Sequence, residues 1–257
     1  MRSFDPPSVF YLIPFTYFQR TRLRSLKEWI FHAWNEWLAN CLILFCAFSF
    51  DAIEAVKCFL IGYIAFISLY EIGYIANDFY AVRNEANPRM RFGRAISRGM
   101  IAFWIVARFA LFAAISYYFQ FGFDWFLFYI ALAIVFALHN LMDDRSLKTY
   151  TFLQLAIFRF WAPVFMFLPK EVVMGLLPIT VLYYVFNRTL TYMDSKDLLK
   201  LPNRTTLSFK LNSGFILLSF SLFWAYYVQS WMAAGIAAYF LLFWVCVKLS
   251  GIKLSSD

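Results

Sequence analysis

Long apolar runs separated by short polar segments dominate the pattern along the chain. Each run holds about 17–22 residues, close to the roughly 20 that an α-helix needs to cross about 30 Å of hydrocarbon. The pattern therefore predicts an all-α chain with about eight membrane-spanning helices. The predicted spans are 34–50, 55–76, 99–118, 124–142, 150–169, 172–190, 212–229 and 231–249.

The composition agrees with a membrane protein and excludes other classes. The 257 residues are 63% hydrophobic and only 15% charged, whereas a soluble domain is roughly 25% charged and about 45–50% apolar. Since single cores stop growing near about 250–300 residues, a soluble fold of this length could not hide so much apolar surface. The same composition excludes a disordered chain. We therefore expect a polytopic membrane helix bundle.

The positive charges indicate the orientation of this bundle. With the N-terminus inside, 19 of the 23 lysines and arginines fall on inner segments. The outer turns keep only Lys57 and Lys170, and Arg108 and Arg159 lie inside predicted spans. The positive-inside rule then places both termini in the cytoplasm. We expect a multi-pass protein of a bacterial inner membrane with its active face towards the cytoplasm.

Three regions follow from this topology: an N-terminal segment over 1–33, a single transmembrane bundle over 34–249 and a cytoplasmic tail over 250–257. The first segment mixes aromatic residues with cations from Arg20 onward. This mixture is typical of a segment that lies in the membrane interface and is attracted to anionic lipid. A simple positive-inside anchor explains it equally well. No pattern indicates a nucleic-acid partner, and the four cysteines and two histidines lack metal-ligand spacing.

The polar residues that could bind a ligand or take part in a reaction concentrate in two predicted inner loops, 77–98 and 191–211. Carboxylate and amide oxygens suit Mg²⁺, and guanidinium and ammonium groups suit phosphate. The candidate Mg²⁺ ligands are Asn77, Asp78, Glu85, Asp194 and Asp197. The candidate phosphate contacts are Arg89, Arg91, Arg94, Lys200 and Arg204. A purely structural role stays open for each of them alone, because the positive-inside rule also demands basic inner loops.

The spacing in these loops resembles that of the UbiA-type superfamily of intramembrane prenyltransferases. In that family the second helix ends in N-D-x-x-D-x-x-x-D, and an R-P-[LI]-x-x-G segment opens the third. Here Asn77-Asp78 ends the second predicted helix, and the segment from Arg94 to Gly99 opens the third. An aspartate pair after the sixth helix, followed by Lys-x-x-x-[KR]-[ST]-[ST], is similar to residues 194–206. At motif level the resemblance covers only these two loops, and at the level of topology most of the chain.

The chain also departs from the family pattern, as a divergent member would. Ala81 replaces the middle aspartate of the first motif, and Glu85 replaces the third. Ala95 stands where the family has proline, and the second pair is spaced D-x-x-D because Leu198 fills the usual position. The family usually has nine helices, against the eight predicted here. Ala81 is compatible with a catalyst using one metal, with a donor carrying one phosphate, or with an inert lipid-binding chain.

The resemblance implies helices around a central cavity that opens towards lipid. Mg²⁺ held by both loops would bind a prenyl diphosphate or a polyprenyl-phosphate lipid, and aromatic faces could stabilise an allylic cation. The catalytic residues implied are Asn77, Asp78, Glu85, Asp194 and Asp197, with Asn77, Glu85, Asp194 and Asp197 as the metal shell. The substrate-binding residues implied are Arg94, Lys200, Arg204, Glu71 and Arg159. For Glu71, a role as buried partner of Arg108 or Arg159 is an equal alternative.

These patterns favour an Mg²⁺-dependent membrane transferase acting on an isoprenoid lipid. The alternative is a catalytically inert, UbiA-like lipid-binding subunit of a membrane complex. A transporter is disfavoured because only Glu71, Arg108 and Arg159 place charge at mid-bilayer. The acceptor, the length of the donor chain and the oligomeric state are not encoded in recognisable motifs.

Overall fold

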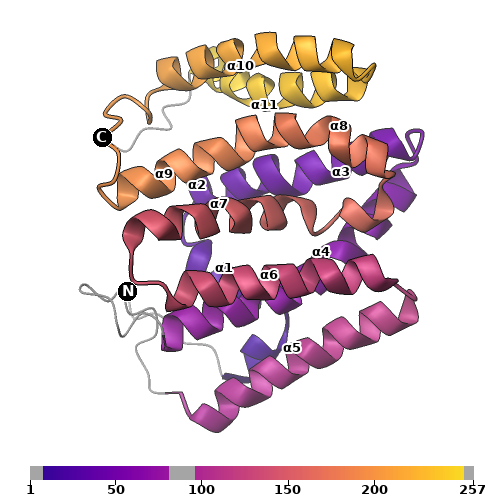
Figure 1. Ribbon diagram of the computed structural model, residues 1–257, viewed down its shortest axis with the longest axis vertical. Coiled ribbons are helices and arrows are strands. Elements are labelled where there is room, and N and C mark those ends of the chain that lie inside the picture. The colour runs from indigo at the N-terminus through magenta and orange to yellow at the C-terminus, as the bar shows by residue number, and fades with distance from the viewer. Residues whose placement is uncertain (1–7, 81–95, 252–257) are drawn as a thin grey trace. The chain divides into compact units, whose positions relative to one another are not determined.

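A computed structural model describes residues 8–80 and 96–251, and every regular element within those ranges is a helix (Figure 1). Six helices in the described residues are long and apolar enough to cross a membrane. They are α4 (Ala52–Phe79), α5 (Arg98–Tyr118), α6 (Phe123–Leu141), the continuous rod Lys170–Ser195, α10 (Leu207–Tyr227) and α11 (Trp231–Ser250). The prediction of an all-α, multi-pass membrane protein is therefore confirmed at this level.

The two other predicted spans, 34–50 and 150–169, correspond to helices that do not meet the same criteria of length and apolarity. The first falls on the π-helical turn η2 (Ala33–Leu38) and α3 (Ala39–Ala47), which follow α2 (Leu26–His32). The second falls on the 17-residue α7 (Arg145–Trp161) and the 3₁₀ turn η4 (Phe165–Phe167). Each includes a buried charged residue, Glu36 or Arg159. The total of eight spans and the cytoplasmic location of both termini stay predictions.

The chain divides into two compact units. Unit 1 comprises Met1–Trp29 and Leu60–Met142, and unit 2 comprises Ile30–Phe59 and Asp143–Asp257. Helix α4 therefore contributes its first residues to unit 2 and the rest to unit 1. The sequence-based division at residues 33 and 249 stays a prediction.

Unit 1 is built around the C-terminal half of α4. The 3₁₀ turn η1 (Ser8–Leu12) and helix α1 (Thr16–Arg22) pack on α4 and α5 through a core of buried apolar residues. That core consists of Tyr11, Tyr17, Ile75, Phe79, Ile101 and Trp104. Helix α6 approaches α4 at Gly73, where an added Cβ would lie 2.4 Å from the ring of Phe136. The segment expected in the membrane interface thus has Tyr17 and Phe18 fully buried within this unit.

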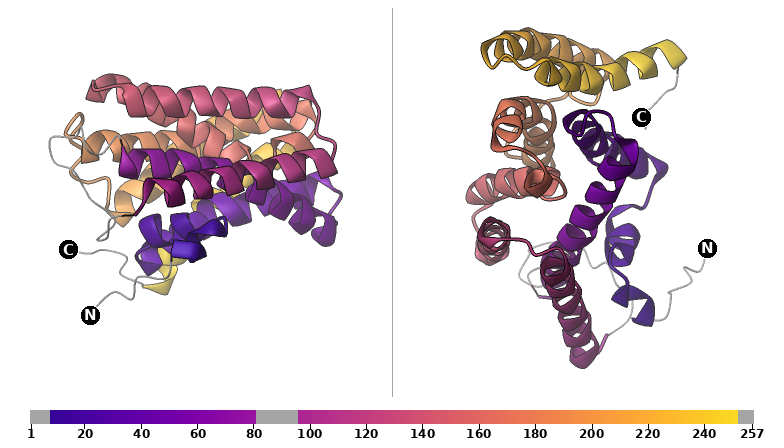
Figure 2. Two further views of the ribbon diagram at one scale, coloured as in Figure 1. Left: turned by 90° about the horizontal axis from the view of Figure 1, so that it is seen from below. Right: turned by 90° about the vertical axis from the view of Figure 1, so that its right-hand side faces the viewer.

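Unit 2 contains the end of α2 with η2 and α3, then α7, the rod of α8 (Lys170–Thr180), η5 (Val181–Phe186) and α9 (Asn187–Ser195), and the hairpin of α10 and α11. Figures 1 and 2 show α10 and α11 side by side. Their close approach depends on Gly214, where a Cβ would lie 2.7 Å from Leu241 Cδ1. The hydroxyl of Tyr183 donates to the carbonyl of Gly214 at 3.0 Å, which joins the rod to the hairpin.

Two π-helical turns, η2 and η5, interrupt the α-helices of unit 2. The turn η5 follows Pro178, which lacks a backbone donor and crowds the carbonyl of the preceding turn. Helix α11 is joined to η2 at Trp34. Its Tyr239 ring stacks on the Trp34 indole with centroids 4.6 Å apart, and its hydroxyl donates to the Trp34 carbonyl at 2.7 Å. These contacts join η2 to α11 within unit 2.

Candidate functional site

The first sequence-predicted position, Asp78, lies buried near the C-terminal end of α4 in unit 1. Both of its carboxylate oxygens accept hydrogen bonds from Arg22, from Nη2 to Oδ1 and from Nη1 to Oδ2, each at 3.0 Å. The hydroxyl of Tyr17 also donates to Oδ2 at 3.0 Å, and Asn77 Nδ2 donates to Oδ1 at 3.1 Å. The carboxylate is therefore held by an arginine of α1, whose guanidinium also lies 4.2 Å over the Tyr74 ring.

Glu71 lies two turns earlier on the same face of α4 and is fully buried. Its Oε1 accepts a hydrogen bond from the backbone N–H of Phe18 at 2.7 Å. Its Oε2 accepts from Arg108 Nε and Nη2 at 3.0 and 2.7 Å. Of the two partners considered for Glu71 from the sequence, Arg108 is the one that contacts it.

Several predicted residues of the first motif lie outside the described residues. Glu85 and Arg94 are among them, together with Ala81 and Ala95, which mark the departure from the family pattern. Their assignment to a metal shell or to a phosphate contact stays a prediction.

The second motif forms the segment that follows α9 in unit 2. Asp194, near the end of α9, accepts a hydrogen bond from Arg204 Nε at 2.7 Å. Arg204 also donates through Nη1 to Thr191 Oγ1 at 3.4 Å, so that it closes the loop back onto the helix. Asp197 adopts a left-handed backbone conformation with φ 58° and is exposed, as is Lys200. The loop thus brings a carboxylate and a guanidinium together and leaves a second carboxylate and an ammonium open to solvent.

The predicted metal ligands that the structure describes come from both compact units. Within the described residues, no group of three or more histidine, cysteine, aspartate or glutamate side chains is arranged to hold a metal ion. Asn77 and Asp78 belong to unit 1, and Asp194 and Asp197 belong to unit 2. The four-residue Mg²⁺ shell therefore stays a prediction.

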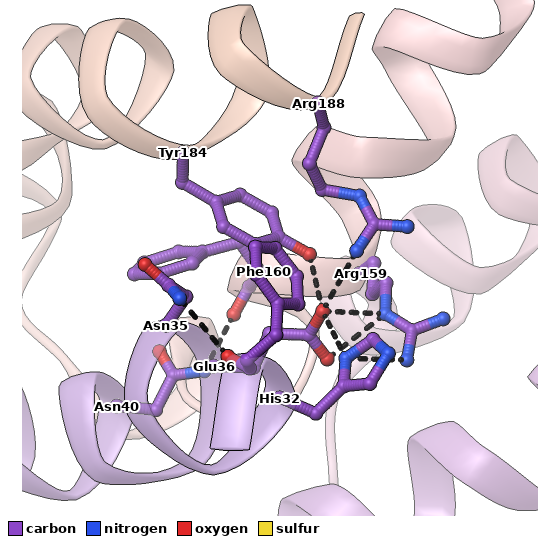
Figure 3. A network of polar contacts seen from close by, with 9 residues as sticks. His32, Asn35, Glu36, Asn40, Arg159, Phe160, Tyr184 and Arg188 are labelled. Carbon is purple, nitrogen blue, oxygen red and sulfur yellow. Dashed lines mark hydrogen bonds and ion pairs between the residues drawn. The ribbon is translucent and has the colours of Figure 1, made fainter. Parts of the chain in front are cut away.

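The most extensive polar cluster of unit 2 surrounds Glu36, which sits in the π turn η2 and is 3% exposed (Figure 3). Arg159 from α7 donates through Nε to both carboxylate oxygens at 2.9 Å. The hydroxyl of Tyr184, in η5, donates to Oε1 at 2.6 Å, and Arg188 from α9 donates through Nη1 to the same oxygen at 3.2 Å. Three helical segments thus direct their donors at one carboxylate.

His32 completes this cluster from the preceding turn of α2. Its Nδ1 lies 2.8 Å from Glu36 Oε1 and 3.4 Å from Arg159 Nη2. Since an ionised carboxylate only accepts hydrogen bonds, Nδ1 must hold a proton for the contact with Oε1. Burial lowers the pKa of His32 below its usual value and so favours the neutral imidazole. Beside the cluster, the side-chain amide of Asn40 donates a hydrogen bond to the backbone carbonyl of Phe160 at 2.9 Å.

The sequence interpretation identified only Arg159 of this cluster. The predicted site does not include Glu36, Tyr184 or Arg188, because none of them belongs to a recognised motif. Glu36 also lies at least 123 residues from each of its partners on α7, η5 and α9. One signal was present: Glu36 is the only carboxylate inside the predicted span 34–50. An ionisable residue within an apolar run indicates a buried partner or a functional role.

Comparison with known proteins adds no family assignment. No family model, no curated protein and no solved structure matches this chain.

Proposed function

We propose that this protein is an integral membrane transferase that acts, with Mg²⁺, on a prenyl diphosphate or a polyprenyl-phosphate lipid. The observation that carries the proposal is the loop of residues 194–204, in which Arg204 bonds Asp194 while Asp197 and Lys200 stay exposed beside it. This arrangement supplies both kinds of group that a metal-bound phosphate requires. The proposed reacting face is cytoplasmic, as the distribution of positive charge predicts.

The donor chemistry of this loop fits the proposed ligand. Carboxylates such as Asp194 and Asp197 are the hard oxygen ligands that Mg²⁺ accepts together with phosphate oxygens and water. Arg204 offers a planar pair of donors to phosphate, and Lys200 offers a mobile positive charge. The metal, when bound, would stabilise negative charge on a departing diphosphate. Arg204 would exchange its bond with Asp194 for one with the phosphate, which releases the carboxylate for the metal.

The test is prenyl transfer by the full chain in lipid nanodiscs supplied with farnesyl diphosphate, Mg²⁺ and total membrane lipid as the acceptor. We expect release of diphosphate, and a loss on the order of 100-fold in Asp194→Asn and in Arg204→Gln. The matched control is Asp143→Asn, since Asp143 is an exposed carboxylate outside the loop. Turnover that is unaffected by Asp194→Asn would contradict the transferase proposal.

A second candidate function is lipid binding without chemistry, as a subunit of a membrane complex. The observation that favours it is the pairing of Asp78 with Arg22 and Tyr17, because a carboxylate held by a guanidinium is less available to a metal ion. Mass spectrometry of lipid extracted from the purified protein separates the two candidates. A co-purified polyprenyl phosphate with no turnover supports the binding subunit, whereas ordinary phospholipid alone argues against both.

A further inference from the structure

The donors around Glu36 outnumber what one carboxylate oxygen accepts. Its Oε1 receives Arg159 Nε, Arg188 Nη1, Tyr184 OH and His32 Nδ1, all within 3.2 Å. A carboxylate oxygen offers two lone pairs, so these four donors crowd Oε1, although Arg159 Nε also reaches Oε2 and the whole carboxylate offers about four acceptor sites. A phosphate monoester presents three terminal oxygens and carries a charge of about −1.5 to −2. A phosphate would therefore spread over three oxygens the donors that Glu36 concentrates on one.

The charges of the cluster also suit a phosphate group. Two guanidiniums, from Arg159 and Arg188, converge on one carboxylate, and burial favours the neutral form of the neighbouring imidazole. Guanidinium groups bind phosphate through paired, planar hydrogen bonds, and they do so more tightly away from bulk water. Both segments that carry Glu36 and Tyr184 are π-helical turns, and such turns occur frequently at functional sites.

We propose that Arg188 and Arg159, assisted by Tyr184, bind the phosphate group of an anionic lipid, and that Glu36 competes with this phosphate for the same donors. The class of ligand is a lipid with a terminal phosphate monoester, for which phosphatidic acid is the simplest probe. Binding would shift the guanidinium bonds from Glu36 Oε1 to the phosphate oxygens. The affinity is then set by the balance between the ligand and an internal carboxylate.

The surroundings of Arg188 indicate the direction of approach and the lipid character of the ligand. Its side chain is 22% exposed, whereas that of Arg159 is only 2% exposed, so a ligand reaches Arg188 first. Aromatic rings surround the Arg188 guanidinium: the centroids of Phe31, Tyr184 and Phe152 lie 5.5, 5.5 and 6.0 Å from its central carbon. These rings hold the guanidinium by cation–π contacts and offer apolar surface next to the proposed phosphate position.

This inference shares Arg159 with the substrate-binding residues that the resemblance implies, but it does not depend on the transfer reaction proposed above. It requires no metal ion and none of the carboxylates of residues 194–204. Binding in the presence of a chelator therefore distinguishes it from an Mg²⁺-dependent site. Loss of turnover in Asp194→Asn would leave it unaffected, and its failure would leave the transferase proposal standing.

The experiment measures phosphatidic acid retained by the full chain after equilibration with mixed micelles of phosphatidic acid and phosphatidylcholine in EDTA. We expect Arg188→Gln to lower the retained phosphatidic acid about tenfold, the effect of losing a charged hydrogen bond. Glu36→Gln keeps the shape of the side chain and removes the competing charge, so it should raise retention several-fold. Arg145→Gln is the matched control, because Arg145 is an exposed arginine of α7 outside the cluster.

Retained phosphatidic acid should fall in Arg188→Gln and rise in Glu36→Gln. Because a misfolded variant can only lose binding, the expected rise in Glu36→Gln cannot be an effect of misfolding. Weaker retention in Glu36→Gln overturns the proposal, as does an equal loss in Arg145→Gln and Arg188→Gln. A parallel titration with inorganic phosphate separates the sources of the group. Displacement of the lipid at similar concentrations of free phosphate would identify a small-anion site and overturn the assignment to a lipid.

Discussion

Arg108 on α5 donates from Nε and Nη2 to a single oxygen of Glu71 on α4, at 3.0 and 2.7 Å, and neither side chain has any exposed surface. The two residues are 37 positions apart in sequence, so their pairing fixes how two membrane-spanning helices of unit 1 face each other. Removing two charges from water is costly, and the cost is offset only while both partners are present.

We therefore expect Arg108→Met to destabilise the protein by about 3–5 kcal/mol, because it leaves the Glu71 carboxylate buried without its guanidinium. The double variant Glu71→Gln/Arg108→Met should recover much of this loss, since the amide oxygen still accepts from the Phe18 N–H. The measurement is thermal unfolding in detergent. Lys57→Met, which breaks an exposed pair with Glu54, should change the midpoint little. A double variant less stable than Arg108→Met would contradict this account.

A second prediction concerns the close contact of α4 with α6. Gly73→Ala should lower stability by about 1–3 kcal/mol, because its methyl group would lie 2.4 Å from the Phe136 ring and force it to move. Phe136→Leu in the same chain should restore part of the loss by making room. Gly235→Ala is the control, since no atom lies within 4 Å of the Cβ it adds. Equal midpoints for the two alanine variants would show that the helices do not pack through Gly73.

The third prediction is a dependence of stability on pH that originates at His32. Burial lowers the pKa of His32 from its ordinary 6.5. Below pH 6.5 the imidazole of His32 gains a proton in the unfolded chain but stays neutral in the folded chain. The contribution of His32 to the free energy of unfolding is therefore complete above this pH and is lost as the pH falls. The unfolding temperature should fall from about pH 7.5 to about pH 5, and fall less in His32→Asn.

The control for this experiment is His139→Asn, which alters the only other histidine. It should retain the slope of the original protein. A slope that disappears in His139→Asn, or persists unchanged in His32→Asn, would assign the titration to another group.

The fourth prediction concerns topology. In a chain whose four cysteines, Cys41, Cys46, Cys58 and Cys246, are replaced by serine, single cysteines introduced by Ser3→Cys or Ser256→Cys should react with an impermeant maleimide only from the cytoplasmic side. Gly122→Cys, in the turn between α5 and α6, should react only from the opposite side. Labelling of the two termini from different sides would rule out an even number of spans.

The spans were predictable from the sequence where a helix meets lipid over most of its length. The predicted 99–118, 124–142 and 231–249 compare with Arg98–Tyr118, Phe123–Leu141 and Trp231–Ser250. In such helices the apolar run and the hydrocarbon thickness set the same limits. The span 34–50 stays a prediction: the segment is helical, but its Glu36 and Asn40 turn inward to partners on other helices.

The polar contacts were less predictable, because they depend on which residues meet in space. Arg204 and Asp194 are ten residues apart and share a motif, so their association was within reach of sequence reasoning. Glu36 meets Arg188 across 152 residues, and nothing local to either residue indicates the other. Arg22 is one of 23 lysines and arginines in the sequence, and nothing near it in the chain indicates that its guanidinium binds Asp78 with both terminal nitrogens.

The π turn η5 sets the rotational phase of the helix that follows it. Successive residues of an α-helix differ by about 100° around the axis, and a π turn holds one residue more than the α-helical turn it replaces. Deleting Leu182 would therefore rotate Arg188 by about 100° relative to Thr180, whose hydroxyl accepts from Trp161 on α7. The deletion would turn the guanidinium away from Glu36 without altering either residue. A single inserted position thus determines which side of α9 faces the buried carboxylate.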